Sequence, residues 1–182
     1  MKKRATNTFS CTFNNQILTF YEECLNVLLL KKENTFSLLD YALSLNCSNI
    51  SFILDEKIFF PYLSLTENFF LGSSIQKKEQ KKYLNKALEL LQLNENILTY
   101  SYEQLDFYLR IKVQLMRSLF VDKKLIVIDN IFAKLTTEQI QELFLLLKIL
   151  TKKKQYTIIL LTTNQKIAKV NDIGNNLNFI TD

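Results

Sequence analysis

The sequence predicts an α/β domain with a largely parallel sheet. Its clearest strands, at residues 25–30, 124–129 and 156–161, are nearly continuous apolar runs, which is typical of strands buried on both faces of a parallel sheet. Segments with the apolar spacing of helices separate these strands. The chain has 182 residues, of which 48% are hydrophobic, so it is long enough to bury one core. We expect one domain over residues 1–182, without repeats or linkers.

The elements are predicted in chain order from this periodicity. They are a strand at 25–30, a turn at 31–34, a helix at 35–45, a strand at 49–54, a helical segment at 64–93, a helix at 105–120, a strand at 124–129, a helix at 136–150, a strand at 156–161 and a short strand at 177–181. One face of the helical segment is apolar and holds Tyr83, Leu84, Ala87, Leu88 and Leu91. Thr136 or Thr137 fits the N-cap of the helix at 136–150, with Glu138 in its first turn.

Composition argues against several classes of protein. Apolar runs end before the roughly 20 residues that a membrane-spanning helix needs, and no apolar signal core follows the basic start at 1–4. The net charge is +5, and the basic run at 77–82 is typical of a solvated helix face. No aromatic-interleaved basic motif is present, so nucleic-acid binding is not expected, although the basic balance permits contact with RNA.

Rare residue types restrict the chemistry. Cys11, Cys24 and Cys47 have no C-x-x-C spacing, and the chain has no histidine. We expect buried cysteines in a reducing compartment and no metal site. The chain has only two glycines and one proline but abundant Lys, Asn, Ile, Leu and Phe. This bias indicates an AT-rich genome, such as that of an organelle or a reduced bacterium.

A strand that ends in a carboxylate is the most informative local pattern. In phosphate-binding α/β ATPases such a carboxylate, here Asp129, holds the water shell of Mg²⁺ at the carboxyl edge of the sheet. Four further landmarks surround it: FPYLSLTEN at 60–68, LDFYL at 105–109, RSL at 117–119 and LTTNQ at 161–165.

With these landmarks in this order, the chain resembles the ATP-binding subunits of ABC transporters over nearly its whole length. The resemblance implies a P-loop-NTPase-like fold, that of an ABC nucleotide-binding domain, with a mostly parallel sheet and a small helical subdomain inserted at 64–104. Within the family the chain looks most similar to the small ATP-binding subunit of the haem exporter of cytochrome c maturation. Asp129, Phe132 and Leu135, with the closing TTNQ at 162–165, carry that likeness.

The phosphate loop of this family is not recognisable in the chain. Such a loop needs glycines because its backbone takes up conformations open to few other residues and lets N–H groups approach phosphates closely. Gly72 and Gly174 lie far from 30–37, where the resemblance places the loop. Glu33, within that segment, would repel a triphosphate.

Other positions of the family's site are occupied by residues that do not fit its chemistry. Five vestigial positions follow from the alignment: Asp129, Asn130, Asn164, Asp106 and Glu56. Asn130 stands where the family has its general base and cannot accept a proton at neutral pH, and Asn164 stands where it has the switch histidine. Asp106 begins the signature helix and is expected to cap it, while Phe107 and Tyr108 would block close approach. The Gln loop falls on Asp55 or Glu56. We therefore expect no ATP hydrolysis, no cofactor and no catalytic residue.

The expected function is that of a scaffold or docking subunit. The family receives the coupling helix of its membrane subunit in a groove corresponding to 55–68. Aromatic residues gather there and are candidates for partner docking: Phe59, Phe60, Tyr62, Phe69 and Phe70. The alternative for these aromatics is core packing beneath the helical subdomain.

The expected partners are a membrane transporter subunit, another ABC domain, or both, within a multi-subunit complex. The location would be the inner face of a membrane, on the matrix side of a mitochondrion if the gene is organellar and otherwise on the cytoplasmic side of a bacterium. Two alternatives stay open: a structural subunit of a large organelle assembly such as a ribosome or respiratory complex, and a true ATPase with divergent motifs.

Overall fold

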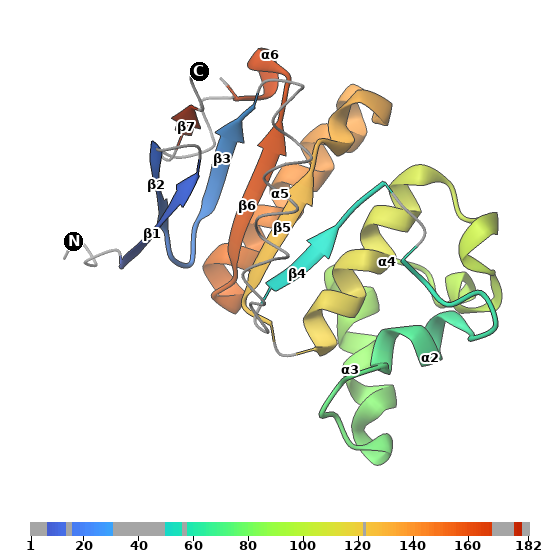
Figure 1. Cartoon of the computed structure of the whole chain (residues 1–182). Helices are drawn as coiled ribbons and strands as arrows, with labels where there is room; N and C mark the ends of the chain where they lie inside the picture. The colour runs from blue at the N-terminus through green and yellow to red at the C-terminus, as the bar shows by residue number, and fades with distance from the viewer. Residues whose placement is uncertain are drawn as a thin grey trace.

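A five-stranded parallel sheet forms the centre of the fold, which confirms the predicted fold class. Its strands lie in the order β4-β5-β6-β3-β7, and each neighbouring pair is parallel. Their bounds are β3 Leu25–Leu29, β4 Ile50–Ile53, β5 Leu125–Asp129, β6 Thr157–Thr162 and β7 Leu177–Phe179. Figure 1 shows helix α5 behind the sheet and the other large helices beside β4. The computed structural model describes residues 7–13, 16–30, 50–55, 58–121, 123–168 and 177–179.

The helices follow the predicted order, with one break. Their bounds are α2 Leu65–Phe70, α3 Lys77–Leu90, α4 Phe107–Phe120, α5 Thr137–Lys154 and α6 Gln165–Ala168, with 3-10 turns η2 Glu95–Thr99, η3 Tyr102–Gln104 and η4 Ile131–Lys134. The elements α2, α3, η2 and η3 occupy the stretch expected to form the helical subdomain, 64–104. Side-chain caps start α2, α4 and α5 but not α3. The cap of α5 is the one that the sequence predicts, and there Thr136 and Gln139 form a capping box.

The continuous helical segment at 64–93 is a wrong prediction. The chain leaves α2 at Leu71 and does not resume a helix until α3, because Gly72 adopts φ +78°, in the left-handed region that other residues rarely enter. Tyr83 is also misplaced by the sequence pattern. Its side chain is 43% exposed, whereas Leu84, Ala87, Leu88 and Leu91 are buried as predicted.

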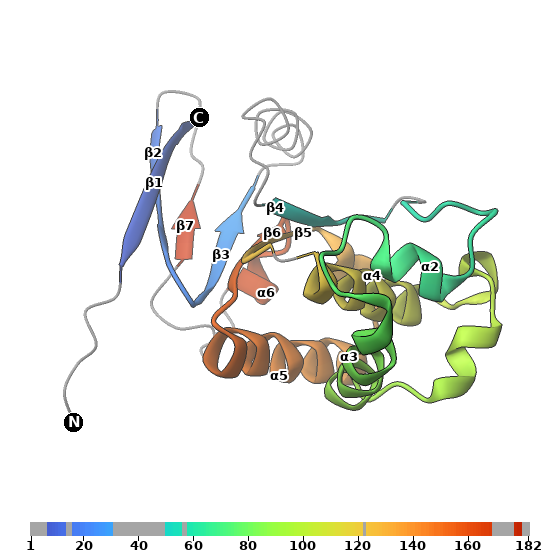
Figure 2. The same cartoon turned by 90° about the horizontal axis from the view of Figure 1, so that it is seen from below.

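The core lies on both faces of the sheet, which explains the continuous apolar strands. Alternate strand residues face α4 and α5 on one side and the N-terminal hairpin on the other. On the helical side lie Val27, Ile126, Ile128, Ile158 and Leu160. On the hairpin side lie Leu28, Val127, Ile159 and Leu161, packed with Leu18 and Phe20. Figure 2 shows α4 and α5 on the same side of the sheet, the helical side.

An N-terminal hairpin was not predicted. Strand β1, Thr8–Phe13, pairs antiparallel with β2, Gln16–Tyr21, in a register that sets Phe13 opposite Gln16. The signal was present as two runs of Thr and aromatic residues joined by Asn14-Asn15. Polar and apolar residues alternate in the first run, TFSCTF, but not in the second, QILTFY, so the pattern marks only one of the two strands.

Several expectations concern exposure or fall outside the described residues. Cys24 is half-buried, so the prediction of full burial is wrong for it. Lysines of the basic run at 77–82 are exposed on α3, as expected of a solvated face. The turn at 31–34, the helix at 35–45, Glu56, Cys47 and Gly174 lie outside the described residues. Among the helices that the structure describes, none is both long and apolar enough to cross a bilayer.

Candidate functional site

The carboxyl edge of the sheet is where the candidate site residues meet. Parallel strands end at the same edge, so Leu30, Asn130 and Thr163, the first residues after β3, β5 and β6, lie at one edge of the sheet. The backbone N–H of Leu30 donates to the carbonyl of Thr162 at 2.9 Å, and that of Asn130 donates to the carbonyl of Leu161 at 3.0 Å. Asp129, half-buried at the end of β5, pairs in register with Leu161. The structure thus brings Asp129, Asn130 and the turn after β6 to one place.

Asn130 occupies the turn after β5 in a left-handed conformation, with φ 34° and ψ 38°. Its side-chain Oδ1 accepts two hydrogen bonds from Thr163, one from the backbone N–H at 3.2 Å and one from the hydroxyl at 3.3 Å. Since a carboxamide is neither an acid nor a base at neutral pH, this side chain supplies hydrogen bonds and no proton transfer.

Asn164 begins the short helix α6. Its backbone N–H donates to the Thr162 hydroxyl at 3.1 Å, and its side-chain Oδ1 accepts from the N–H of Lys166 at 2.9 Å. The carbonyl of Asn164 accepts from the N–H of Ala168 at 3.1 Å. These contacts give the exposed Asn164 the geometry of an N-cap.

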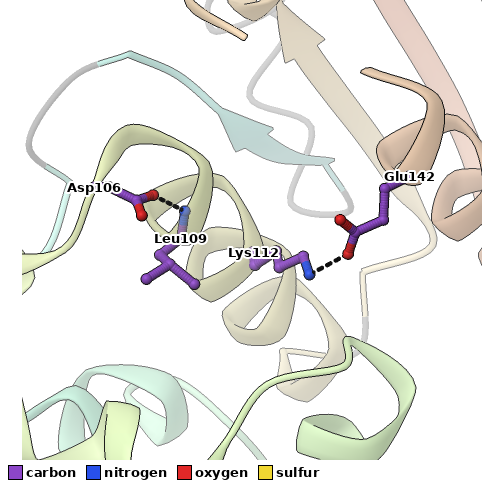
Figure 3. Close-up of polar contacts among 4 residues, drawn as sticks. All are labelled: Asp106, Leu109, Lys112 and Glu142. Atoms are coloured by element: carbon purple, nitrogen blue, oxygen red, sulfur yellow. Dashed lines mark hydrogen bonds and ion pairs between the residues drawn. The ribbon is translucent and has the colours of Figure 1, made fainter. Parts of the chain in front are cut away.

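Asp106 caps helix α4, as the sequence predicted. Its Oδ1 accepts from the backbone N–H of Leu109 at 2.8 Å (Figure 3). The carboxylate therefore satisfies one of the N–H groups that the start of a helix otherwise offers to an anion, and it places a negative charge at the positive end of the helix dipole.

Tyr108 does not stand at this helix start as a barrier, which corrects the expectation from sequence. Its side chain is buried against α5, and the Lys112 ammonium lies 4.8 Å from the centre of its ring. Burial raises the pKa of Tyr108, and the nearby Glu142 carboxylate raises it further. Phe107 is half-buried, and the Lys134 ammonium lies 5.2 Å from its ring centre.

A buried ion pair links α4 to α5. The Lys112 side chain is 6% exposed, and its Nζ lies 2.6 Å from Oε1 of Glu142, whose side chain is 41% exposed (Figure 3). A charge-assisted bond of this length holds the two helices in register while leaving one partner in contact with solvent.

Two further polar contacts organise the segment after β4. Asp55, one of the two positions expected for the Gln loop, forms an exposed ion pair with Lys134 of η4. Gln114 of α4, which we did not single out from the sequence, is buried and makes three hydrogen bonds to the backbone of Leu54 and the hydroxyl of Tyr102. The signal that could have found it was an amide between apolar neighbours, in the run Val113-Gln114-Leu115-Met116.

The candidate docking aromatics divide into buried and exposed residues. Phe59 and Phe69 are 6% and 0% exposed, and Phe59 stacks on Tyr102 at 4.6 Å between ring centres. These two cannot contact a partner, so their assignment to a docking surface is wrong. Phe70 is half-buried and stacks on Phe120 at 4.6 Å.

Phe60 and Tyr62 remain on the surface. They are 41% and 78% exposed, and their ring centres lie 5.6 Å apart. Asn68, fully buried beneath them, accepts from the N–H of Phe60 at 2.8 Å and donates to the carbonyls of Phe60, Leu63 and Ser64. The loop that displays the two rings is therefore braced from inside.

Solved structures of ABC cassettes share the fold of this chain. The bacterial ABC transporter cassette MJ0796, solved as a dimer, matches with a TM-score of 0.69 and 16% identity, covering 95% of this chain and 91% of that chain. CbiO1 from Clostridium perfringens, part of the ABC transporter complex CbiONQ, matches with a TM-score of 0.69 and 14% identity, covering 87% and 77% of the two chains. The chain has the fold of an ABC nucleotide-binding cassette.

Sequence comparison adds a distant relative of this cassette. A probable sulfate/thiosulfate import ATP-binding protein CysA of Chlorella vulgaris is 32% identical over 116 residues, which are 62% of this chain and 49% of that protein. The chain thus matches about half the length of the curated relative. No protein-family model matches the sequence. The chain is therefore related to ABC ATP-binding domains.

Proposed function

We propose that this cassette is a catalytically inactive subunit that docks on the membrane subunit of a transporter complex. Asn130 is the observation that carries the proposal. The family's general base corresponds to this position, where the side-chain oxygen is turned toward Thr163 and the group cannot accept a proton.

Two other observations support inactivity. Asp106 uses its carboxylate to cap α4, where the resemblance places the signature that contacts a nucleotide. With two glycines and no histidine in the whole chain, neither a glycine-rich phosphate loop nor a switch histidine can be built. The described residues therefore do not fit the family's ATP and Mg²⁺, and no hydrolytic step is derived through them.

The exposed aromatic pair supports docking. Phe60 and Tyr62 lie in the segment that corresponds to the coupling-helix groove of the family, and Asn68 fixes their loop in advance of binding. A pre-organised loop loses little conformational entropy when a partner covers it, and exposed aromatic residues are frequent binding hot spots. We propose a membrane subunit as the partner, with the cassette on the inner face of the membrane.

This proposal leaves two alternatives for the transported substrate. The likeness to the haem exporter of cytochrome c maturation, together with the AT-rich composition, favours haem export on the matrix side of a mitochondrial membrane. The name of the Chlorella vulgaris relative instead suggests sulfate or thiosulfate import. Phe132, one of the residues behind the haem-exporter likeness, is buried and stacks on Phe144, so it reflects core packing rather than substrate choice.

Nucleotide turnover by the purified chain tests inactivity. We expect phosphate release from MgATP to equal that of Asp129→Ala, because Asp129 is the one carboxylate retained from the family's metal-binding strand. Turnover above background that disappears in Asp129→Ala would overturn the proposal and favour the alternative of a true ATPase with divergent motifs.

Purification in mild detergent from the native source tests docking. We expect a membrane subunit to co-purify with the wild type and with Ile17→Ala, which removes a side chain 74% exposed on the hairpin, but not with Tyr62→Ala. Equal recovery with all three proteins would argue against the aromatic pair. Co-sedimentation with ribosomes that is lost at high salt would favour the assembly-subunit alternative.

A further inference from the structure

The backbone at Asn130 favours asparagine over the glutamate of the family. Residue 130 has φ 34° and ψ 38°, in the left-handed region. Asparagine enters this region far more readily than longer side chains, since its short amide bonds locally. A glutamate here would meet backbone strain and, being one methylene longer, would not place its oxygen where Oδ1 now lies.

The side chain of Asn130 continues the pairing of two strands beyond the sheet. The last register pair of β5 and β6 is Asp129 with Leu161. Past that pair, the N–H of Asn130 donates to Leu161 at 3.0 Å, and Oδ1 accepts from the N–H and the hydroxyl of Thr163. One hydrogen bond therefore joins the turn after β5 to the end of β6, and two join it to Thr163 in the turn after β6.

These bonds also determine where Asn164 lies. Thr163 is held by Asn130, and the N–H of Asn164 is held by the Thr162 hydroxyl. The side chain of Asn164 then caps Lys166 at the start of α6. The position that corresponds to the family's switch histidine is thus tied through Thr163 to the position that corresponds to its general base.

We propose that Asn130 is a clasp that holds the turn after β6, and with it Asn164 and α6, in one conformation. The clasp makes this edge insensitive to nucleotide, a consequence that rests on the inactivity proposed above. In this way a pair of positions used for catalysis by relatives becomes a structural link in this chain.

Hydrogen exchange of the amides of residues 163–168 tests the clasp, with three variants that separate its components. Asn130→Asp keeps the acceptor and tolerates the left-handed turn, so exchange should stay within about twofold of wild type. Asn130→Gly tolerates the turn but lacks the acceptor, and the loss of ordinary hydrogen bonds should speed exchange about fivefold to tenfold. Asn130→Glu should speed exchange at least as much, because it adds strain.

Exchange at Val27, in the centre of the sheet, reports whether each variant is folded. If the Asn130→Gly variant loses protection at Val27, the Thr163→Val variant is used in its place. The Thr163→Val change removes only the hydroxyl donor to Asn130, and it should speed exchange at 163–168 about twofold or more. Unchanged exchange at 163–168 in the folded Asn130→Gly or Thr163→Val variant would overturn the clasp.

Hydrogen exchange measured with and without MgATP tests the clasp and the proposed inactivity separately. With millimolar MgATP, exchange at 163–168 in the wild type should change less than about twofold. Slower exchange with MgATP would overturn the insensitivity and count against the inactive assignment. The clasp itself would still stand if Asn130→Gly accelerates exchange without nucleotide.

Discussion

Gln114 ties helix α4 to the edge strand of the sheet. Its side chain is 2% exposed. Oε1 accepts from the N–H of Leu54 at 2.9 Å, while Nε2 donates to the carbonyl of Leu54 at 2.8 Å and to the hydroxyl of Tyr102 at 2.9 Å. Beyond the end of β4, an edge strand of the sheet, the amide thus makes the two backbone hydrogen bonds that a neighbouring strand would make.

We predict that Gln114→Met lowers the free energy of unfolding by about 2–4 kcal/mol. Methionine nearly conserves the volume, so the change removes hydrogen bonds without opening a cavity. Three bonds at about 1 kcal/mol each set the centre of this range. Because Leu54 is only half-buried, water can reach part of its backbone and keeps the loss below that of fully buried groups.

Urea unfolding followed by far-UV circular dichroism measures this loss. The slope against urea should not change, because the variant exposes the same surface on unfolding. The matched control is Gln141→Met, on the exposed face of α5, which should stay within about 0.5 kcal/mol of wild type. If Gln114→Met is as stable as this control, the hydrogen bonds do not stabilise the fold and the reasoning is refuted.

Two further predictions concern charged groups. Glu142→Gln removes the counter-charge of the buried Lys112 and should cost about 1–3 kcal/mol in the same urea assay; an effect no larger than that of the exposed Glu89→Gln would contradict it. The hydroxyl and N–H of Ser64 hold the pKa of Glu67 below its usual value. A group with a lowered pKa stabilises the fold above its unfolded-state pKa and loses this effect as the pH falls through its folded-state pKa. From about pH 6 to pH 3, the urea midpoint of wild type should therefore fall further than that of Glu67→Gln, and equal falls would contradict the assignment.

The strands were predictable because burial on both faces leaves a direct mark on the sequence. A strand such as β5 has no solvent face, so its residues form an apolar run that ends where the chain leaves the sheet. The cap of α5 was also predictable, because Thr136 and Gln139 bond within one turn and need no distant partner.

The aromatic residues were less predictable because their exposure depends on elements far apart in the chain. Phe59 is buried because Tyr102 and Phe69 pack against it, whereas Tyr62, three residues away, lies beside Phe60 and stays 78% exposed. Tyr108 and Tyr83 were misplaced for the same reason. Periodicity gives the face of a helix, but the tertiary packing decides how much of that face is covered.

Composition and local pattern were enough to predict the α/β fold, and they show two glycines and no histidine in the chain, because neither depends on residues distant in sequence. The contacts of Asn130, in contrast, follow from the tertiary structure. Asn130 and Thr163 are separated by 33 residues, and their hydrogen bonds exist because two parallel strands end at the same edge. Long-range contacts of this kind leave no periodic signal in the sequence.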